Sequence, residues 1–153
     1  MATPDGQLVA EFWVPGVPQP GGSKKAFMNP RTKRIVVVDA CKRNKDWRTS
    51  VQASAVDHYD GNPVTCPLSL TVNFVIPRPK GHYGTGKNAD KIKASAPLYP
   101  AKKPDATKLL RSTEDALTGI IWRDDAQIVE QVVRKTWGEK SGAWIKVETM
   151  GEQ

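Results

Sequence analysis

The sequence predicts an α/β (α+β) fold in which helices pack on a small mixed β-sheet. Segments of β-branched and aromatic residues, as expected for strands, recur at 8–14, 68–76, 127–137 and 143–149. Helical periodicity is found at about 40–59 and between Asp105 and Gly119. With 153 residues, 39% of them hydrophobic, the chain suits one domain, 1–153, with helices against one or both faces of the sheet.

The chain begins with a predicted strand and a predicted hairpin. Residues 8–14 are typical of a buried strand that ends at Pro15, and the Pro- and Gly-rich residues 16–23 that follow are incompatible with a helix. Strand-like segments at 26–29 and 34–38 flank a basic turn, which indicates a β-hairpin. Arg31, Lys33 and Arg34 at the tip of this hairpin are therefore placed to touch an anionic backbone.

A helix over about 40–59 is predicted to follow, with Asp39 as its cap. Its apolar face would contain Trp47, Val51, Ala55 and His58. We interpret His58 as a packing residue rather than a ligand. After a turn at 60–63, residues 68–76 alternate as a central strand does.

The segment 78–103 has no periodicity and an uneven charge. It contains a single acid, Asp90, against seven basic residues, Arg78, Lys80, Lys87, Lys91, Lys93, Lys102 and Lys103. The whole chain has 23 Lys and Arg against 16 Asp and Glu, a net charge of +7. Long insertions of this kind are usually functional or mobile, and clustered positive charge favours a polyanion. We expect a flexible basic flap that orders on DNA, with a short helix at 89–94.

The segment 103–128 combines an amphipathic helix with acidic residues at both of its ends. Pro104 and Asp105 mark the start of the helix, and Gly119 is a good C′ residue. Asp124 and Asp125 then precede a β-branched run, and only one of two adjacent strand residues can face the helix. A hard cation such as Mg²⁺ needs oxygen ligands from few protein groups, so Asp105 and one of this pair are candidate ligands. The alternative is that these residues only cap a helix and form a polar turn.

The motifs of this segment resemble those of the RusA family of Holliday junction resolvases. The resemblance rests on the ordered set Lys-Pro-Asp, Leu-Leu-Arg, Asp-Ala-Leu-Thr-Gly and Trp-Arg-Asp-Asp-Ala-Gln-Ile, between residues 103 and 128. The N-terminal stretch 14–24, a strand running into a Pro/Gly loop, is also similar to that family's opening. These motifs cover about a quarter of the chain.

The resemblance implies an intertwined homodimer that cuts four-way DNA junctions with Mg²⁺, or Mn²⁺ as a substitute, held by aspartates. Carried over by motif position, the catalytic candidates are Asp105, Asp125, Asp124, Arg111 and Lys108. The three aspartates are also the candidate metal ligands. The basic residues expected on DNA are Lys24, Lys25, Arg31, Lys33, Arg34, Lys80, Lys87, Lys91, Lys93, Lys102 and Lys103.

One position departs from the family pattern. The family commonly has a second Asp two residues after the first, and here that residue is Thr107. A hydroxyl binds Mg²⁺ more weakly than a carboxylate and brings no charge. Glu114, about two turns further on the same face, would offer a replacement oxygen only across roughly 10 Å. The departure predicts reduced metal affinity at this position.

Composition excludes several classes of function. No apolar run approaches the ~20 residues of a membrane span, and the first residues lack the pattern of a signal peptide, so we expect a cytoplasmic protein. Cys41 and Cys66 are too few for a disulfide framework or a zinc site, and both are expected to be reduced. Gly-Gly-Ser-Lys-Lys at 21–25 lacks P-loop spacing, which argues against a nucleotide cofactor.

Three functions remain open at this point. The first is a structure-selective, Mg²⁺-dependent endonuclease acting on Holliday junctions in recombination, repair or phage DNA processing. The second is a junction or duplex DNA-binding protein that has weakened or lost cleavage, because Thr107 stands where the family has an aspartate. The third is an unrelated basic binding module, for RNA for example, in which the acidic motif only caps a helix.

Overall fold

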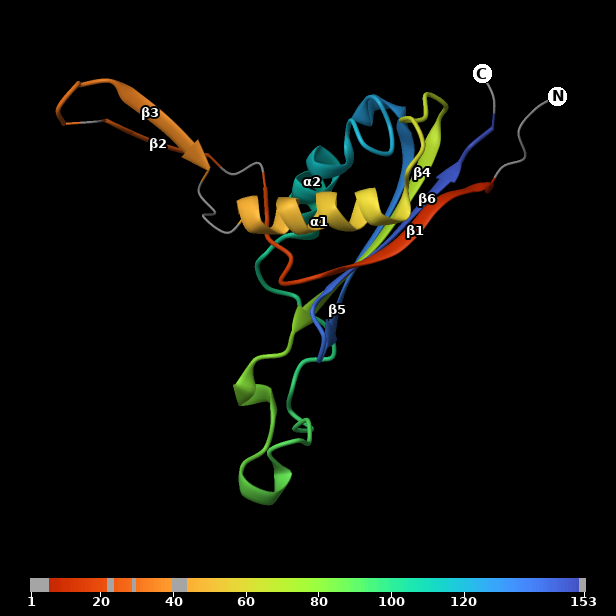
Figure 1. Ribbon diagram of the computed structural model, residues 1–153. Helices are drawn as coiled ribbons and strands as arrows, with labels where there is room; N and C mark the ends of the chain where they lie inside the picture. Colours follow the sequence, from red (N-terminus) through yellow and green to blue (C-terminus); the bar gives the residue numbers. More distant parts are fainter. Residues whose placement is uncertain (1–5, 22–23, 29, 40–43, 152–153) are drawn as a thin grey trace.

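The computed structural model describes residues 6–21, 24–28, 30–39 and 44–151 (Figure 1). In chain order its strands and α-helices are β1 (Leu8–Pro15), β2 (Lys24–Met28), β3 (Ile35–Asp39), α1 (Asn44–His58), β4 (Leu68–Pro77), α2 (Ala106–Leu117), β5 (Ile128–Gly138) and β6 (Gly142–Thr149). Three short 3₁₀ turns are η1 (Lys80–His82), η2 (Gly86–Asn88) and η3 (Asp125–Gln127).

Four strands form one mixed sheet in the order β1-β6-β4-β5. The β4–β5 pair is parallel, whereas β4–β6 and β1–β6 are antiparallel. The predicted α+β class with a small mixed sheet is therefore confirmed, and residues 68–76 lie in a central strand as expected. β5 is at the edge of the sheet, where it runs beside α2 (Figure 1).

The core lies between one face of the sheet and the two helices. Alternate strand residues such as Phe12, Val72 and Ile145 are fully or almost fully buried against the helices. Trp47 of α1 donates from its indole Nε1 to the Thr113 hydroxyl of α2, at 3.2 Å between N and O. This bond fixes the two helices against each other within the core. On the opposite sheet face Trp144 is 52% exposed, so the helices cover one face.

The β2–β3 hairpin projects from the rest of the molecule (Figure 1). Its strands are antiparallel, with Lys24 opposite Asp39 and Met28 opposite Ile35, so the hairpin prediction is confirmed. Asp39 is the last residue of β3 and α1 begins at Asn44, so the expected cap was wrong. Residues 40–43, including Cys41, lie outside the described part of the chain.

The insertion between β4 and α2 contains no helix at 89–94, and that prediction was wrong. The backbone amides of Gly84 and Lys93 donate across the insertion to the carbonyls of Lys91 and His82, at 2.9 and 2.8 Å. These pairings hold the two halves of the insertion side by side, so the backbone groups a helix would need are already used. None of the described helices is long and apolar enough to cross a membrane.

Candidate active site

The first candidate site residue, Asp105, lies at the N-terminus of α2. Its backbone is extended and occupies the N-cap position, as predicted, but its side chain makes no capping hydrogen bond. The Asp105 side chain is 61% exposed, and the Lys108 ammonium lies 4.0 Å from its carboxylate. Because the carboxylate is not used by the helix backbone, its oxygens remain available to a ligand.

The residues just before Asp105 are held by the edge strand. The Lys135 ammonium of β5 donates to the carbonyl oxygens of Lys102 and Pro104, at 2.9 Å each. The Lys103–Pro104 peptide bond is cis. Two charge-assisted hydrogen bonds from one side chain therefore fix the chain that leads into Asp105.

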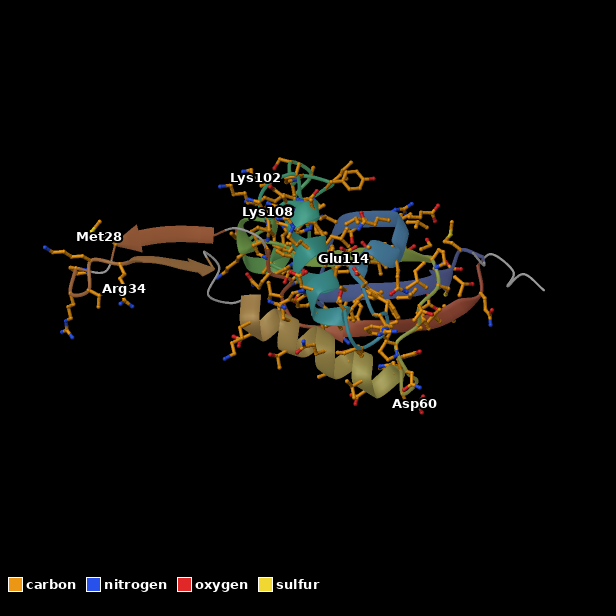
Figure 2. The ribbon with its side chains drawn as sticks, turned by 90° about the horizontal axis from the view of Figure 1, so that it is seen from above. Met28, Arg34, Asp60, Lys102, Lys108 and Glu114 are labelled. Atoms are coloured by element: carbon orange, nitrogen blue, oxygen red, sulfur yellow. The ribbon has the colours of Figure 1, made fainter. Side chains whose placement is uncertain are left out.

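α2 is amphipathic in the way its sequence predicts. One face is buried and consists of Leu109, Leu110, Ser112, Thr113, Ala116 and Leu117. The other face carries the exposed residues Thr107, Lys108, Arg111 and Asp115. Gly119 follows the helix with a φ of 91°, as expected for a C′ glycine. Lys108 and Arg111, the two basic candidates, thus share the solvent face with Thr107. Figure 2 shows Lys108 near the start of the helix.

The two adjacent aspartates have different roles in the structure. Asp124 caps η3, because its carboxylate accepts from the Ala126 amide at 2.9 Å. Gln127 accepts from the Asp124 amide at 2.9 Å and donates to the carbonyls of Val64 and Cys66. One oxygen of the Asp124 carboxylate is therefore engaged in the capping box of η3.

Asp125 lies close enough to α2 for its charge to act on a helix residue. It is the exposed first residue of η3, and its charge acts on Glu114 of α2. Burial raises the pKa of the Glu114 carboxyl, a hydrogen bond from Gln131 lowers it, and the charges of Asp125 and Asp115 raise it further. The sequence left open which aspartate faces the helix, and the effect of the Asp125 charge on Glu114 favours Asp125.

The candidate ligands do not form a three-residue metal site. Within the ranges that the structure describes, no group of three or more Asp, Glu, His or Cys residues is close enough to hold one ion. Asp105 precedes the first turn of α2, whereas Asp125 lies by Glu114, nine residues or roughly 13 Å further along the helix. Exposed single carboxylates fit a hydrated Mg²⁺, which commonly takes one or two carboxylates and completes its shell with water and phosphate.

The predicted DNA-binding residues lie on two arms. Lys80, Lys87, Lys91, Lys93, Lys102 and Lys103 are all exposed on the insertion. Arg31, Lys33 and Arg34 are exposed at the tip of the β2–β3 hairpin, where Figure 2 shows Arg34 far from the helices. Lys24 and Lys25 are on β2, but their side chains are outside the described set.

The contacts that fasten the insertion to β5 were not predicted from the sequence. The Arg78 guanidinium lies over the Trp137 ring, 5.2 Å from its centroid, and donates to the Pro97 carbonyl at 3.0 Å. His82 packs edge-on against the same indole, with ring centroids 5.2 Å apart. The only sequence indication was a tryptophan at the end of a strand next to a basic segment.

Comparison with known proteins identifies the family. The profile described as Endodeoxyribonuclease RusA matches residues 15–148. The chain belongs to the RusA family. It is also 28% identical, over 130 residues, to the uncharacterized protein YqaN of Bacillus subtilis strain 168. The aligned region covers 85% of this chain and 89% of YqaN.

Membership of the RusA family makes this protein an endodeoxyribonuclease, a phosphodiester hydrolase of a Holliday junction resolvase family. RusA resolvases are metal-dependent nucleases whose substrate is a DNA junction. An unrelated basic binding module, the third function considered from the sequence, is therefore no longer supported.

Proposed function

We propose that this RusA-family chain is a Mg²⁺-dependent, structure-selective endonuclease that resolves Holliday junctions as a homodimer. One observation carries the proposal: the exposed face of α2 presents Lys108 and Arg111 between Asp105 at its start and Asp125 beside its third turn. Acidic groups for a cation and basic groups for a phosphate thus share one surface. Such a combination suits phosphodiester hydrolysis.

Each residue has a distinct role in this proposal. Asp105 and Asp125 each offer one carboxylate to a hydrated cation, and Lys108 and Arg111 stabilise negative charge on the phosphate. When bound, Mg²⁺, or Mn²⁺ in its place, supplies Lewis-acid polarisation of the phosphate and lowers the pKa of an attacking water. Asp124 acts indirectly, because its capping of η3 positions Asp125.

The two basic arms support DNA as the partner. The insertion and the hairpin tip present exposed Lys and Arg side chains at separate places on the surface (Figure 2). Contacts to phosphates from such side chains give sequence-independent affinity and orient the substrate. Selectivity for a branched substrate follows if the two arms engage different duplex arms of a junction.

The β2–β3 hairpin supports the homodimer. An isolated two-stranded hairpin is only marginally stable in water, and this one projects from the body with Met28 63% exposed. Its sequence contains Phe27 and the run Ile35 to Val38, an apolar composition that favours a covering partner. A second copy would also provide a second site for the opposing strand of a two-fold junction.

The decisive experiment is cleavage of a synthetic four-way junction by the purified protein. We expect paired nicks in Mg²⁺, none in EDTA, and much slower cleavage of a linear duplex with the same sequence. Light scattering at micromolar concentration should give the mass of a dimer. Equal cleavage of junction and duplex would contradict structure selectivity, and a monomeric mass would contradict the homodimer.

A second candidate is a junction-binding protein with weak cleavage. It is favoured by Thr107, which is exposed on α2 where the family pattern has an aspartate, and by the lack of a three-carboxylate group in the described residues. Tight, selective junction binding without nicks in either Mg²⁺ or Mn²⁺ would favour this candidate over the first.

A further inference from the structure

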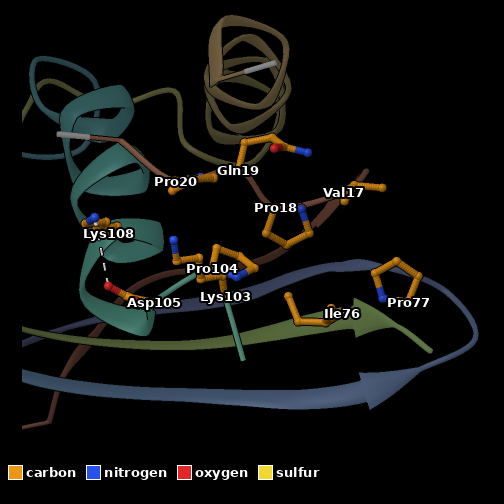
Figure 3. A pocket seen from close by; sticks show the side chains of 10 residues that line it. All are labelled: Val17, Pro18, Gln19, Pro20, Ile76, Pro77, Lys103, Pro104, Asp105 and Lys108. Carbon is orange, nitrogen blue, oxygen red and sulfur yellow. Dashed lines mark ion pairs between the residues drawn. The ribbon is translucent and has the colours of Figure 1, made fainter. Parts of the chain in front are cut away.

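A pocket with a volume of about 460 Å³ opens beside Asp105 (Figure 3). Its size lies within the about 300–1,000 Å³ typical of small-ligand sites. The residues that line it are Val17, Pro18, Gln19, Pro20, Ile76, Pro77, Lys103, Pro104, Asp105 and Lys108. We call it the proline pocket. In Figure 3 the loop 17–20 lies on one side, the end of β4 on another, and the first turn of α2 on a third.

The walls of the proline pocket are fixed by contacts outside it. The Gly21 amide donates to the Lys108 carbonyl at 2.9 Å, which ties the loop 17–20 to α2. A Cβ at Gly21 would lie 3.0 Å from Ser112 Cα, closer than an ordinary van der Waals contact, so this close approach favours glycine. Lys135 holds the opposite wall through the carbonyls of Lys102 and Pro104. A pocket with held walls binds its ligand without the cost of ordering them.

The lining combines apolar walls with a charged edge. Prolyl rings, Val17 and Ile76 supply flat or aliphatic surface, while Lys103 and Lys108 supply positive charge next to the Asp105 carboxylate. A free phosphate would leave the apolar walls unused, and a purely apolar ligand would leave the lysines unused. A nucleotide satisfies both, because its base has apolar faces and its phosphate carries negative charge.

The position of the proline pocket links it to the DNA path. Pro77 and Lys103, at the two roots of the basic insertion, both line it, and Asp105 is a proposed cation ligand. A strand that runs along the insertion to Asp105 therefore passes the pocket. Unstacking a base costs least where the base is already poorly paired, and bases at a branch point meet that condition.

We propose that the proline pocket receives one unstacked nucleobase from the strand that is cut, close to the branch point. The inference rests on the proposed function and adds a basis for its selectivity. A junction offers a base that enters at low cost, whereas a continuous duplex does not. The pocket also gives the enzyme a means of preferring particular bases near the cut.

The first measurement locates the base. Junctions carrying 2-aminopurine at single positions near the crossover are bound by the wild-type protein in EDTA. We expect a fluorescence increase at one position, because 2-aminopurine brightens when it leaves the stack. No increase at any position, with junction binding and cleavage intact, would overturn this inference alone. Failure of the wild type to bind junctions would overturn the proposed function and the inference together.

The second measurement couples that base to the pocket. Val17→Phe narrows the pocket from a position that is 46% exposed, and Val56→Phe makes the same change on α1, at 59% exposure. Replacing the located base with an abasic site should weaken wild-type binding about fivefold or more, within the range of a base-stacking contact. The loss should persist in Val56→Phe and nearly vanish in Val17→Phe.

If the abasic site lowers junction affinity equally in Val17→Phe and Val56→Phe, the inference is overturned. A change from dimer to monomer in Val17→Phe by light scattering would also overturn it, because the pocket would then be filled by a second copy. If Val17→Phe does not fold, as judged by circular dichroism, Val17→Met narrows the pocket with a flexible side chain and answers the same question.

Discussion

The Gln131 side-chain amide donates to Oε1 of Glu114, which connects edge strand β5 to the helix α2 beside Asp125. Glu114 is half-buried, and its burial together with the nearby Asp125 and Asp115 charges outweighs this bond, so its pKa lies above the usual 4.5. The folded state therefore binds the Glu114 proton more tightly than the unfolded state does. The contribution of Glu114 to the stability of the wild-type protein therefore rises as the pH falls from the Glu114 pKa of the folded state toward 4.5.

Glu114→Gln should therefore stabilise the metal-free protein at neutral pH, by on the order of 0.5 kcal/mol, since it removes the partly buried charge and keeps an oxygen for Gln131. The gain should vanish below the unfolded pKa, where both side chains are neutral. Urea denaturation in EDTA at several pH values measures it. Glu139→Gln, on the exposed turn after β5, controls for loss of one negative charge. A less stable Glu114→Gln protein at neutral pH would contradict the argument.

Lys135→Met should destabilise the fold by about 1–3 kcal/mol, because two carbonyl groups lose a charged donor while the aliphatic stem is kept. The affected carbonyls belong to Lys102 and Pro104, just before Asp105. The midpoint of urea denaturation gives the change in the free energy of unfolding. Lys140→Met, at an exposed turn position, is the matched control and should stay near wild type. Equal effects of the two changes would show that the Lys135 bonds contribute nothing.

Replacing Lys87, Lys91 and Lys93 together with alanine should weaken junction binding and flatten its salt dependence. Each phosphate contact contributes about 0.9 to the slope of log K against log salt, so the slope should fall by up to about 3. Filter binding or fluorescence anisotropy between low and physiological salt measures it. The control is a variant in which alanine replaces Lys45, Arg48 and Lys140 together, because it removes the same charge from other parts of the surface. An unchanged slope in the first variant would remove these three residues from the DNA interface.

Thr107→Asp should keep the fold, because position 107 is exposed in the first turn of α2, where a negative charge is favourable by about 0.3–1 kcal/mol. If Thr107 limits cation binding, the change should lower the Mg²⁺ concentration needed for half-maximal cleavage. Thr107→Asn, which is nearly isosteric with Asp but uncharged, should leave that concentration close to the wild-type value. No shift with Asp would place residue 107 outside the cation shell.

Local sequence patterns were sufficient to predict the strands of the sheet and α2, because strand alternation and helix boundary residues lie within each segment. They failed for Asp39, which has the chemistry of a cap but pairs with Lys24 in the hairpin. The predicted helix at 89–94 in the insertion was wrong for a similar reason, since the backbone of Lys93 pairs with that of His82, eleven residues away. In both places a pairing between distant residues overrides the local preference.

In the candidate site, too, local features were predicted from the sequence and long-range contacts were not. The position of Asp105 at the start of the amphipathic helix α2 was predicted from the local sequence. The separate roles of Asp124 and Asp125 depend on Gln127, which reaches the carbonyls of Val64 and Cys66 more than 60 residues earlier in the chain. Lys135 likewise acts on backbone 31 to 33 residues away. The residue pattern within one segment does not predict such long-range contacts.

Asp125→Asn should abolish most cleavage while leaving folding and junction binding intact. Asn keeps the size and hydrogen bonding of Asp but removes its charge, so the cation loses a ligand and its electrostatic partner. Cleavage of the four-way junction in Mg²⁺ should fall about a hundredfold or more. Junction affinity should persist or rise, because repulsion between the carboxylate and the DNA phosphates is relieved.

Two neighbouring changes make the Asp125 test specific. Asp115→Asn removes the same charge from the exposed face of α2 and should cleave almost as well as wild type. Asp124→Asn keeps a good capping side chain, so it should also retain most activity if Asp124 serves η3 rather than the cation. If Asp125→Asn cuts junctions at the wild-type rate, Asp125 is not a cation ligand. If Asp124→Asn is as inactive as Asp125→Asn, the capping role is insufficient and both carboxylates act at the cation.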